Sequence, residues 1–535
     1  MTRIAVVGGG ASGLMAAVTA GSFRNSEVVI FEQNDRTGRK ILATGNGRCN
    51  LSNTNASPEH YYSRNREFVR YALDICDPQK TLALFSEMGL LCKEEYGGRV
   101  FPYSQQASTV VDVFRNRLAV LGVKVESGVS IREVVPLKDG FLLKAVRTDV
   151  SGERKQSEGI QSEDRHNKDI RSEGRRSESK QSESKQSVAK QSDDKQNEGK
   201  QNEEFFCHRL ILACGGMAAP ALGSDGSGFS ILKKLGHTII QPVPALVQLQ
   251  AEPDFCKGLA GIKAECGIEA FIAGREAGRE AGRETDRETG REMGRETDRE
   301  TDWEDGQALG QVRGQLLDQA ADQTAAQVAG QAIDSAVGQI AGRAVCQAID
   351  QAAGEVLFTN YGLSGSGILD ISRVLYRRNE FVLRLDFLPE YPLEDVETML
   401  FERRENLAEL NLEQYLVGLL NKKIGYALLK RSGIRRLSGS VSDLQDAEIK
   451  NIARTIKNLE IVVMGHNGWK NAQVTAGGAD TREFDSRTME SAKIRGLYCA
   501  GEILDVFGDC GGYNLQWAWS SGYVAGLSAA GGTGC

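Results

Sequence analysis

The sequence lacks the features that mark membrane, secreted or disulfide-stabilised proteins. Its 535 residues contain no apolar run of about 18 residues, which a membrane-spanning helix requires. Only Met1–Arg3 precede the first predicted strand, so we expect no signal peptide. The 11 cysteines include no C-x-x-C or C-x4-C pair, which argues against a disulfide framework and a dithiol redox relay. These absences predict a soluble, cytoplasmic protein.

A large excess of one sign of charge is also lacking. The 72 acidic residues outnumber the 65 basic ones only slightly, which gives a net charge of -7. No global field therefore recruits nucleic acid or an anionic membrane, although a local basic patch is compatible with this balance. No metal site is predicted. The length exceeds what one hydrophobic core organises, so two or three domains are expected.

What the sequence does contain is a glycine motif at its N-terminus. Four β-prone residues run into Gly8-x-Gly10-x-x-Gly13, and an Ala-rich helical segment follows. The three glycines have separate predicted roles: a tight turn, close approach of the backbone to a pyrophosphate, and close packing of helix on strand. Glu32 ends the next predicted strand, where a carboxylate can accept hydrogen bonds from ribose hydroxyls. The motif predicts an adenine-dinucleotide site at a helix N-terminus.

Residues 36–53 form a predicted loop that wraps a ligand, because they are rich in Gly, Asn and cations and have no hydrophobic period. Arg39 and Lys40 can neutralise phosphate charge. Gly45 and Gly47 allow backbone N–H groups to approach a ring.

Two low-complexity segments interrupt predicted strands. Residues 151–204, between strands at 141–147 and 205–213, are too polar to bury a core, and we expect them to be disordered. Residues 274–353 begin with a repeated [Gly/Asp]-Arg-Glu-x unit and continue with a Gln/Ala-rich half that is compatible with a helix. Both are interpreted as insertions at hairpin tips, where long loops are tolerated.

The order of the predicted elements indicates an α/β protein whose nucleotide-binding domain is interrupted. Residues 1–236 form its first part, 237–440 a β-rich substrate domain with a helical lobe, and 441–535 its C-terminal part. Helices are predicted over 66–92, 106–121, 396–407 and 412–420.

The C-terminal part supplies a second nucleotide-facing element. A short apolar strand ends at Gly501-Glu502, and a helix begins after Gly512. A helix N-terminus stabilises negative charge that develops on a ring system. FAD is long enough to be contacted by both ends of the chain, whereas a plain NAD dehydrogenase has no use for this second element.

Several long motifs carry a specific resemblance: GRKILATGNGRCN (38–50), LFTNYGLSG (357–365), VTAGG (474–478), AGEILD (500–505) and CGGYNLQW (510–517). The chain resembles the BaiN/RdsA-type flavoproteins, a branch of the two-dinucleotide-fold FAD oxidoreductases, and is most similar to the BaiN-like branch. The resemblance implies a Rossmann-like, glutathione-reductase-like FAD-binding domain with an inserted β-rich domain. Asn360 and Ser366 depart from the family, which often has His and usually has Pro at these positions.

The resemblance also implies the residues that bind FAD. They are Gly8, Gly10, Ala11, Ser12, Gly13, Glu32, Gln33, Arg39, Lys40, Ala43, Thr44, Gly45, Gly47, Asn50, Val129, Ala213, Gly215, Gly501, Glu502, Gly512, Asn514 and Leu515. Candidates for a catalytic role are Cys49, Arg48 and Tyr513, and the sequence assigns no role to any of them.

The activity implied by the resemblance is reduction of an activated C=C bond. Hydride from reduced flavin adds to the β-carbon of an enone, and an acid protonates the α-carbon. A 3-oxo-Δ4 or Δ6 bile-acid or steroid intermediate is the expected substrate, with NAD(P)H as electron donor. The alternatives are reduction of a uridine in 23S rRNA to dihydrouridine and an amine oxidase that uses O2. The absence of an aromatic-plus-basic nucleic-acid module favours the small-molecule substrate.

Overall fold

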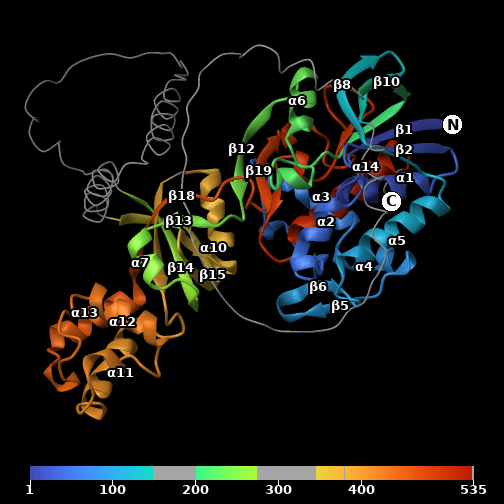
Figure 1. The fold of residues 1–535 in the computed structure, drawn as a ribbon. Coiled ribbons are helices and arrows are strands. Elements are labelled where there is room, and N and C mark those ends of the chain that lie inside the picture. The colour runs from blue at the N-terminus through green and yellow to red at the C-terminus, as the bar shows by residue number, and fades with distance from the viewer. Residues whose placement is uncertain (149–199, 274–344, 379, 533–535) are drawn as a thin grey trace, which may run out of the picture. The chain divides into compact units, whose positions relative to one another are not determined.

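The computed structural model describes residues 1–148, 200–273, 345–378 and 380–532. The chain divides into unit 1, Met1–Ala245 with Gly468–Cys535, and unit 2, Leu246–Asn467 (Figure 1). These boundaries differ from the predicted ones at 236/237 and 440/441. Strand β12 (Ile239–Ala245) pairs with β19 (Val474–Ala479) inside unit 1, whereas helix α13 (Asp446–Lys457) and strand β18 (Leu459–His466) complete unit 2.

Unit 1 is built on a parallel sheet with the strand order β20-β11-β1-β2-β7. The strands span Thr2–Val7 (β1), Ser26–Glu32 (β2), Lys124–Ser127 (β7), Arg209–Leu212 (β11) and Leu497–Cys499 (β20). Val7 aligns with both Phe31 and Leu212, so the carboxyl ends of the central strands meet at one edge. Open α/β sheets bind ligands at this edge.

The helices of unit 1 span Ala11–Gly21 (α1), Arg39–Ala43 (α2), Glu67–Ile75 (α3), Pro78–Glu87 (α4), Ala107–Val120 (α5), Ser227–Lys234 (α6) and Tyr513–Ala529 (α14). Of these, α1 and α14 pack on the parallel sheet, and α3 and α4 pack on α14. The helix predicted over 66–92 is two helices, because the Asp77 side chain accepts from the Lys80 N–H and Pro78 begins a new helix. Trp517 and Trp519 on α14 are buried in the core.

Helices α1 and α14 join the two ends of the chain. A Cβ atom built on Gly522 would lie 2.4 Å from the Ser12 carbonyl oxygen, and one on Gly526 would lie 2.4 Å from that of Ala16. Only glycine permits this approach, which brings the C-terminal helix against the helix of the N-terminal motif.

Antiparallel strands extend unit 1. They are β8 (Val129–Leu137), β9 (Gly140–Thr148) and β10 (Lys200–Cys207) in one sheet, β3 (Ser52–Asn53), β6 (Arg99–Pro102) and β5 (Cys92–Glu95) in another, and β4 (Tyr61–Tyr62) paired with β21 (Phe507–Gly508). The strand predicted over 205–213 is two strands in different sheets, because the His208 N–H bonds to the Arg3 carbonyl between them. Strand β10 begins at Lys200, so the predicted disorder is wrong for 200–204: pairing with β9 outweighs the polar composition. Residues 151–199 lie outside the described residues.

Unit 2 contains a closed barrel with the strand order β13-β16-β15-β14-β17-β18. Its strands are β13 (Leu249–Ala251), β14 (Lys263–Ala273), β15 (Val345–Thr359), β16 (Gly362–Ser364), β17 (Phe381–Asp386) and β18. Residues 345–353 were assigned to the second insertion, but they form strand because β15 pairs with β14 along its length. Residues 274–344 lie outside the described residues.

The helices of unit 2 are α7 (Pro253–Gly258), α10 (Ser366–Ile371), α11 (Leu393–Asn406), α12 (Lys422–Arg431) and α13. The last three form the helical lobe between β17 and β18 (Figure 1). The helix predicted over 412–420 is wrong, since only a 3₁₀ turn forms at Leu412–Gln414. The predicted Rossmann-like α/β fold with a β-rich insertion and a helical lobe is confirmed. No helix in the described part of the chain combines the length and apolar character needed to cross a bilayer.

Candidate functional site

The glycine turn after β1 shows three different reasons for glycine. Gly8 has a φ of +107°, and a Cβ built on it would lie 2.3 Å from the Ala213 carbonyl oxygen. A Cβ on Gly13 would lie 1.9 Å from the Gly8 carbonyl oxygen, so helix α1 packs directly on the turn. A Cβ on Gly10 would meet no described atom within 4 Å. The fold therefore requires Gly8 and Gly13, whereas Gly10 leaves room for a ligand beside the N-terminus of α1.

Glu32 lies at the carboxyl end of β2 and is buried. Its Oε2 accepts a hydrogen bond of 2.7 Å from the Gly9 N–H, and its Oε1 accepts from the backbone and side-chain amides of Asn34 at 2.8 and 2.6 Å. A carboxylate offers about four acceptor positions. Glu32 thus fixes the glycine turn and keeps capacity for a hydroxyl group.

The predicted loop at 36–53 is anchored to both ends of the chain. The Lys40 Nζ lies 2.8 Å from Glu502 Oε2, and Glu502 Oε1 accepts from the Thr475 N–H at 2.9 Å. The charge of Lys40 is therefore balanced within the protein. A Cβ built on Gly501 would lie 2.4 Å from Ser12 Oγ, which places the segment that follows β20 against α1.

The second half of this loop has a compact left-handed backbone and meets the N-terminus of α14. Gly45, Gly47 and Cys49 have φ values of +56°, +82° and +61°. The Asn50 Oδ1 is buried, and it has no hydrogen-bond partner among the described residues. A Cβ on Gly512 would lie 2.9 Å from this same oxygen. An orphaned acceptor at the start of a helix fits a ligand that donates an N–H.

The other predicted FAD contacts lie at the same edge of the parallel sheet or beside α14. The Ala213 N–H bonds to the Val7 carbonyl oxygen at 2.8 Å, and Gly215 follows with a φ of +72°. Val129 begins β8 one residue after Gly128, whose N–H bonds to the Asn34 carbonyl. The remaining contacts are placed by their elements: Gln33 directly after β2, Arg39 at the first position of α2, Ala43 and Thr44 at the end of α2, and Asn514 and Leu515 in the first turn of α14.

Two of the candidate catalytic residues, Arg48 and Cys49, are held by contacts inside the protein. The Arg48 Nη2 lies 2.6 Å from Glu95 Oε2, and its guanidinium covers the Phe101 ring at 4.1 Å. Cys49 is fully buried, and burial raises the pKa of its thiol to about 12. Neither group is suited to exchange a proton with a substrate. Tyr513, the third candidate, lies at the first position of α14.

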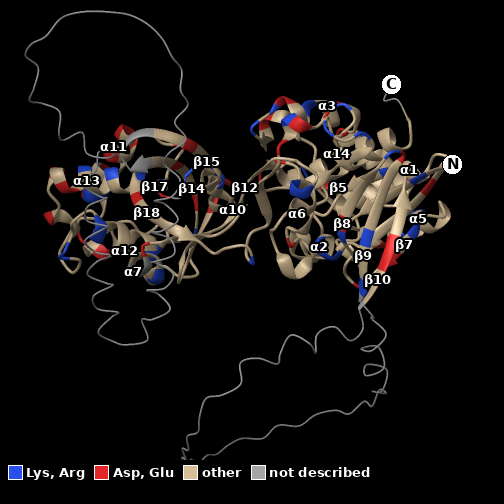
Figure 2. Cartoon of the chain, turned by 90° about the horizontal axis from the view of Figure 1, so that it is seen from above, with Lys and Arg blue, Asp and Glu red and all other residues tan. Residues whose placement is uncertain are grey.

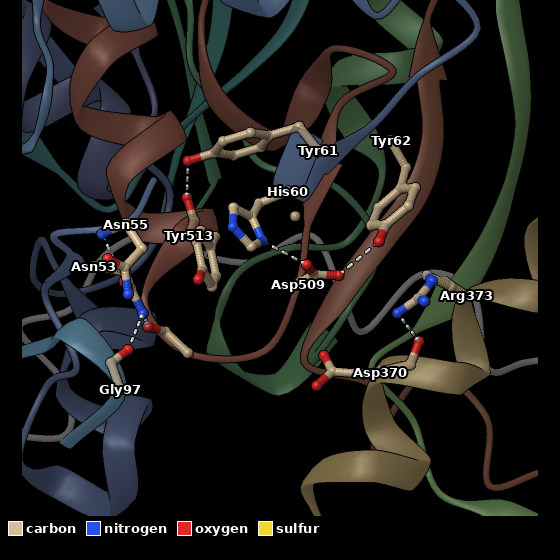
Figure 3. Close-up of polar contacts among 12 residues, drawn as sticks. Asn53, Asn55, His60, Tyr61, Tyr62, Gly97, Asp370, Arg373, Asp509 and Tyr513 are labelled. Carbon is tan, nitrogen blue, oxygen red and sulfur yellow. Dashed lines mark hydrogen bonds and ion pairs between the residues drawn. The ribbon is translucent and has the colours of Figure 1, made fainter. Parts of the chain in front are cut away.

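The sequence did not single out a polar cluster beside Tyr513 (Figure 3). The His60 Nδ1 lies 3.0 Å from Asp509 Oδ2, and the Tyr62 hydroxyl donates to Asp509 Oδ1 at 2.8 Å. The His60 ring stacks on the Tyr513 ring with 4.5 Å between centroids. Pairing of β4 with β21 brings these residues together from opposite ends of the chain, and no local motif encodes such a pairing. The scarcity of histidine, five in the chain, was the one usable signal.

These features define the class: an α/β protein of the Rossmann type, with the glycine turn and the C-terminal helix at one edge of a parallel sheet. A family model described as "HI0933-like protein Rossmann domain" matches residues 2–157 and 167–528. The chain belongs to this family, and the predicted membership of the BaiN/RdsA-type flavoproteins is confirmed.

Three relatives match nearly the whole chain. A 3-dehydro-bile acid delta(4,6)-reductase of Clostridium scindens is 31% identical over 535 residues, which cover 99% of both chains. A ribosomal RNA dihydrouridine synthase of Haemophilus influenzae is 25% identical and covers 98% of this chain and 97% of the relative. The enzyme of the same name from Escherichia coli is 24% identical and covers 97% and 96%.

Proposed function

We propose that the chain is an FAD-dependent reductase of an activated C=C bond in a 3-oxo-Δ4 or Δ6 bile-acid or steroid intermediate, with NAD(P)H as the electron donor. One observation carries the proposal: a relative named as a 3-dehydro-bile acid delta(4,6)-reductase is similar along the entire chain, in both units. The geometry of unit 1 supports the cofactor.

The residues of unit 1 fit FAD at three points. The open position at Gly10 and the free N–H groups that begin α1 suit the pyrophosphate, and α1 has no side-chain cap that would compete for them. Glu32 suits the adenosine ribose. Asn50 Oδ1, which lacks a donor among the described residues, suits an N–H at the edge of the flavin ring.

Bound FAD would supply a hydride for the substrate. The chain would hold the flavin between the loop at 43–50 and the start of α14, where Gly512, Asn514 and Leu515 lie. The N-terminus of α14 has no side-chain cap and offers its N–H groups to a negatively charged ring edge. Asn514 is fixed for this role, because its Oδ1 accepts from the Gly508 N–H at 2.8 Å and its Nδ2 donates to the Gly508 carbonyl.

Reduction of a uridine in rRNA is the alternative, and the two dihydrouridine synthases among the relatives speak for it. Their lower identity and the charge distribution favour a small molecule. Lys and Arg residues alternate with Asp and Glu over the helical lobe (Figure 2). Arg404 pairs with Asp446, and Arg436 pairs with Glu448, so these cations are partly neutralised.

The test begins with the colour of the protein. Gly10→Val should give folded but colourless protein, since Gly10 has an extended backbone with a φ of -82° and a Cβ built on it meets no described atom within 4 Å, so the added side chain would occupy the space proposed for the cofactor. The control is Gly258→Val at the end of α7, another glycine whose built Cβ meets no described atom within 4 Å. That variant should stay yellow. A yellow Gly10→Val protein with full FAD content would contradict the cofactor assignment.

The same protein then tests the substrate. Wild-type enzyme is reduced anaerobically with NADH or NADPH and mixed with a 3-oxo-Δ4 bile acid or with unmodified 23S rRNA. We expect the yellow colour to return with the bile acid and a saturated product to form. Reoxidation by the rRNA alone would overturn the bile-acid assignment in favour of the alternative.

A further inference from the structure

We propose that His60 is the proton donor of this reaction, held by Asp509 and replenished from solvent. The inference rests on the proposed function and adds the residue that protonates the α-carbon of the enone. No motif of the sequence and none of the relatives' names points to it.

His60 lies beside the start of α14. His60 ends a short 3₁₀ helix, η2 (Pro58–His60), directly before β4, and its ring stacks on Tyr513 at the first position of α14. The same end of α14 meets the loop at 43–50, because Asn53 Nδ2 donates to the Gly511 carbonyl at 3.0 Å and Gly512 approaches Asn50. His60, which lies beside Tyr513 in Figure 3, therefore borders the place where the two predicted flavin-binding segments converge.

The His60 ring is held in a fixed orientation by its neighbours. Figure 3 shows the imidazole ring between the Tyr513 ring and Asp509. Asp509 accepts from His60 Nδ1 and from the Tyr62 hydroxyl, and the Asp509 N–H donates to the His60 carbonyl at 3.0 Å. A carboxylate on Nδ1 orients the ring and keeps the proton on Nδ1 when Nε2 gives up its own. Nε2 has no hydrogen-bond partner among the described residues, so the proton that it carries is available.

The His60–Asp509 pair is in contact with solvent. The His60 side chain is 35% exposed and that of Asp509 is 19% exposed. A donor that is partly exposed recovers its proton from water between turnovers, whereas a buried donor needs a relay.

A hydride from the cofactor and a proton from His60 together complete the reduction of the C=C bond. The β-carbon of the enone gains a hydride from the reduced cofactor, which is thereby oxidised by two electrons. The π pair of the C=C bond then forms the new α-carbon–hydrogen bond with the proton from His60 Nε2. The N–H bonding pair stays on the imidazole, which is left neutral with its proton on Nδ1.

Neighbouring groups fit the role less well. Cys49 is fully buried with a raised pKa, and Arg48 is engaged by Glu95. Burial raises the pKa of Tyr61 well above its usual value, and its hydroxyl already donates to the Tyr513 carbonyl oxygen at 3.0 Å. Among these side chains, His60 alone combines a titratable proton, a fixed orientation and contact with solvent.

The experiment separates the two half-reactions. His60→Gln and wild-type holoenzyme are reduced with dithionite, and each is reoxidised either by a 3-oxo-Δ4 bile acid or by ferricyanide, which needs no proton on carbon. We expect bile-acid reoxidation of the variant to slow by about 100-fold or more, with ferricyanide reoxidation unchanged. His60→Ala should regain part of its rate with added imidazole. The control His208→Gln, at a histidine that bonds to the Arg3 N–H, should match wild type.

A second variant keeps the test decisive if His60→Gln does not retain FAD. Asp509→Asn leaves the ring in place but removes the charge beside it, and should slow bile-acid reoxidation by about 10-fold. Wild-type rates in either variant that binds FAD, or no rescue of His60→Ala by imidazole, would overturn the assignment of His60. Failure of wild-type enzyme to react with the bile acid would instead overturn the proposed function.

Discussion

Two histidine–carboxylate pairs, both among the described residues of unit 1, have nearly the same geometry and opposite surroundings. His60 lies 3.0 Å from Asp509, and His237 lies 2.9 Å from Glu483. The His60 side chain is 35% exposed, whereas that of His237 is fully buried. The first pair borders the predicted flavin site, and the second joins the end of α6 to the segment after β19.

The difference lies in the second ring nitrogen. Ser491 Oγ accepts from the N–H groups of Lys493 and Ile494, which fills both its acceptor positions. Its hydroxyl proton must then go to His237 Nε2, 3.0 Å away, and His237 Nδ1–H donates to Glu483. His237 is thus a neutral ring with both nitrogens bonded, although a Ser–His–Glu series resembles a hydrolytic triad. Pair geometry alone does not identify a reactive histidine; the state of the second nitrogen does.

The largest expected effect comes from removing the buried ring. His237→Leu should lower the free energy of unfolding by about 3 kcal/mol, because Ser491 and Glu483 each lose a buried partner. Urea denaturation followed by tryptophan fluorescence measures it, since Trp517 and Trp519 lie in the core of unit 1. FAD content of the folded protein should not change.

The exposed ring provides the matched control. His60→Leu should change the free energy of unfolding by less than about 1 kcal/mol, because a partly exposed pair contributes little. If His60→Leu cost as much stability as His237→Leu, the contrast between a structural and a reactive pair would be lost.

Acid should weaken the buried pair next. Burial lowers the pKa of His237, although Glu483 opposes this effect. The unfolded chain therefore binds the proton more readily, and stability should fall as pH drops below about 6.5, the usual histidine value. Burial opposes ionisation of Glu483, but bonds from Lys493, Thr238 and His237 prevail and lower its pKa from 4.5 to about 2. A second loss should follow as pH falls from 4.5 towards 2.

Unfolding midpoints of wild type and His237→Leu, measured from pH 7.5 to 5, check the first of these losses. The wild-type curve should fall more steeply than that of the variant. Parallel curves would show that His237 does not bind its proton on unfolding.

The sequence predicted the strand, glycine turn and helix that a local pattern encodes. Gly8, Gly10 and Gly13 specify a turn that any strand–helix junction of this kind requires, and Glu32 follows at a fixed spacing. The parallel sheet, the interrupted nucleotide-binding domain and the helical lobe followed from the order of such signals. Pairing within hairpins explains the wrong boundaries of the two predicted insertions. Strands β10 and β15 include residues whose composition indicated disorder or helix.

The rest depends on pairing between distant segments. In the sequence, nothing distinguishes Gly522 and Gly526 from other helix residues; their close approach to α1 is visible only in the structure. The pairing of β4 with β21 likewise joins Tyr61 and Tyr62 to a strand near the C-terminus. Cys49 and Arg48 were chosen for their place in the flavin-side loop, but burial and the Glu95 partner are three-dimensional facts. The backbone geometry of one motif was predictable, whereas a cluster assembled from two ends of the chain was not.

The smallest expected effect comes from a change beside the Asp509 carboxylate rather than at the His60 ring. Tyr62→Phe removes one hydrogen bond to Asp509 and leaves His60 in place. Bile-acid reoxidation should slow by about fivefold, because one hydrogen bond that orients its acceptor contributes about 1 kcal/mol. The neighbouring Tyr61→Phe is the matched control: its hydroxyl donates to the Tyr513 carbonyl and not to Asp509, so it should cost stability without slowing that step selectively against ferricyanide. Equal rates in both variants would mean that the orientation of Asp509 does not depend on Tyr62.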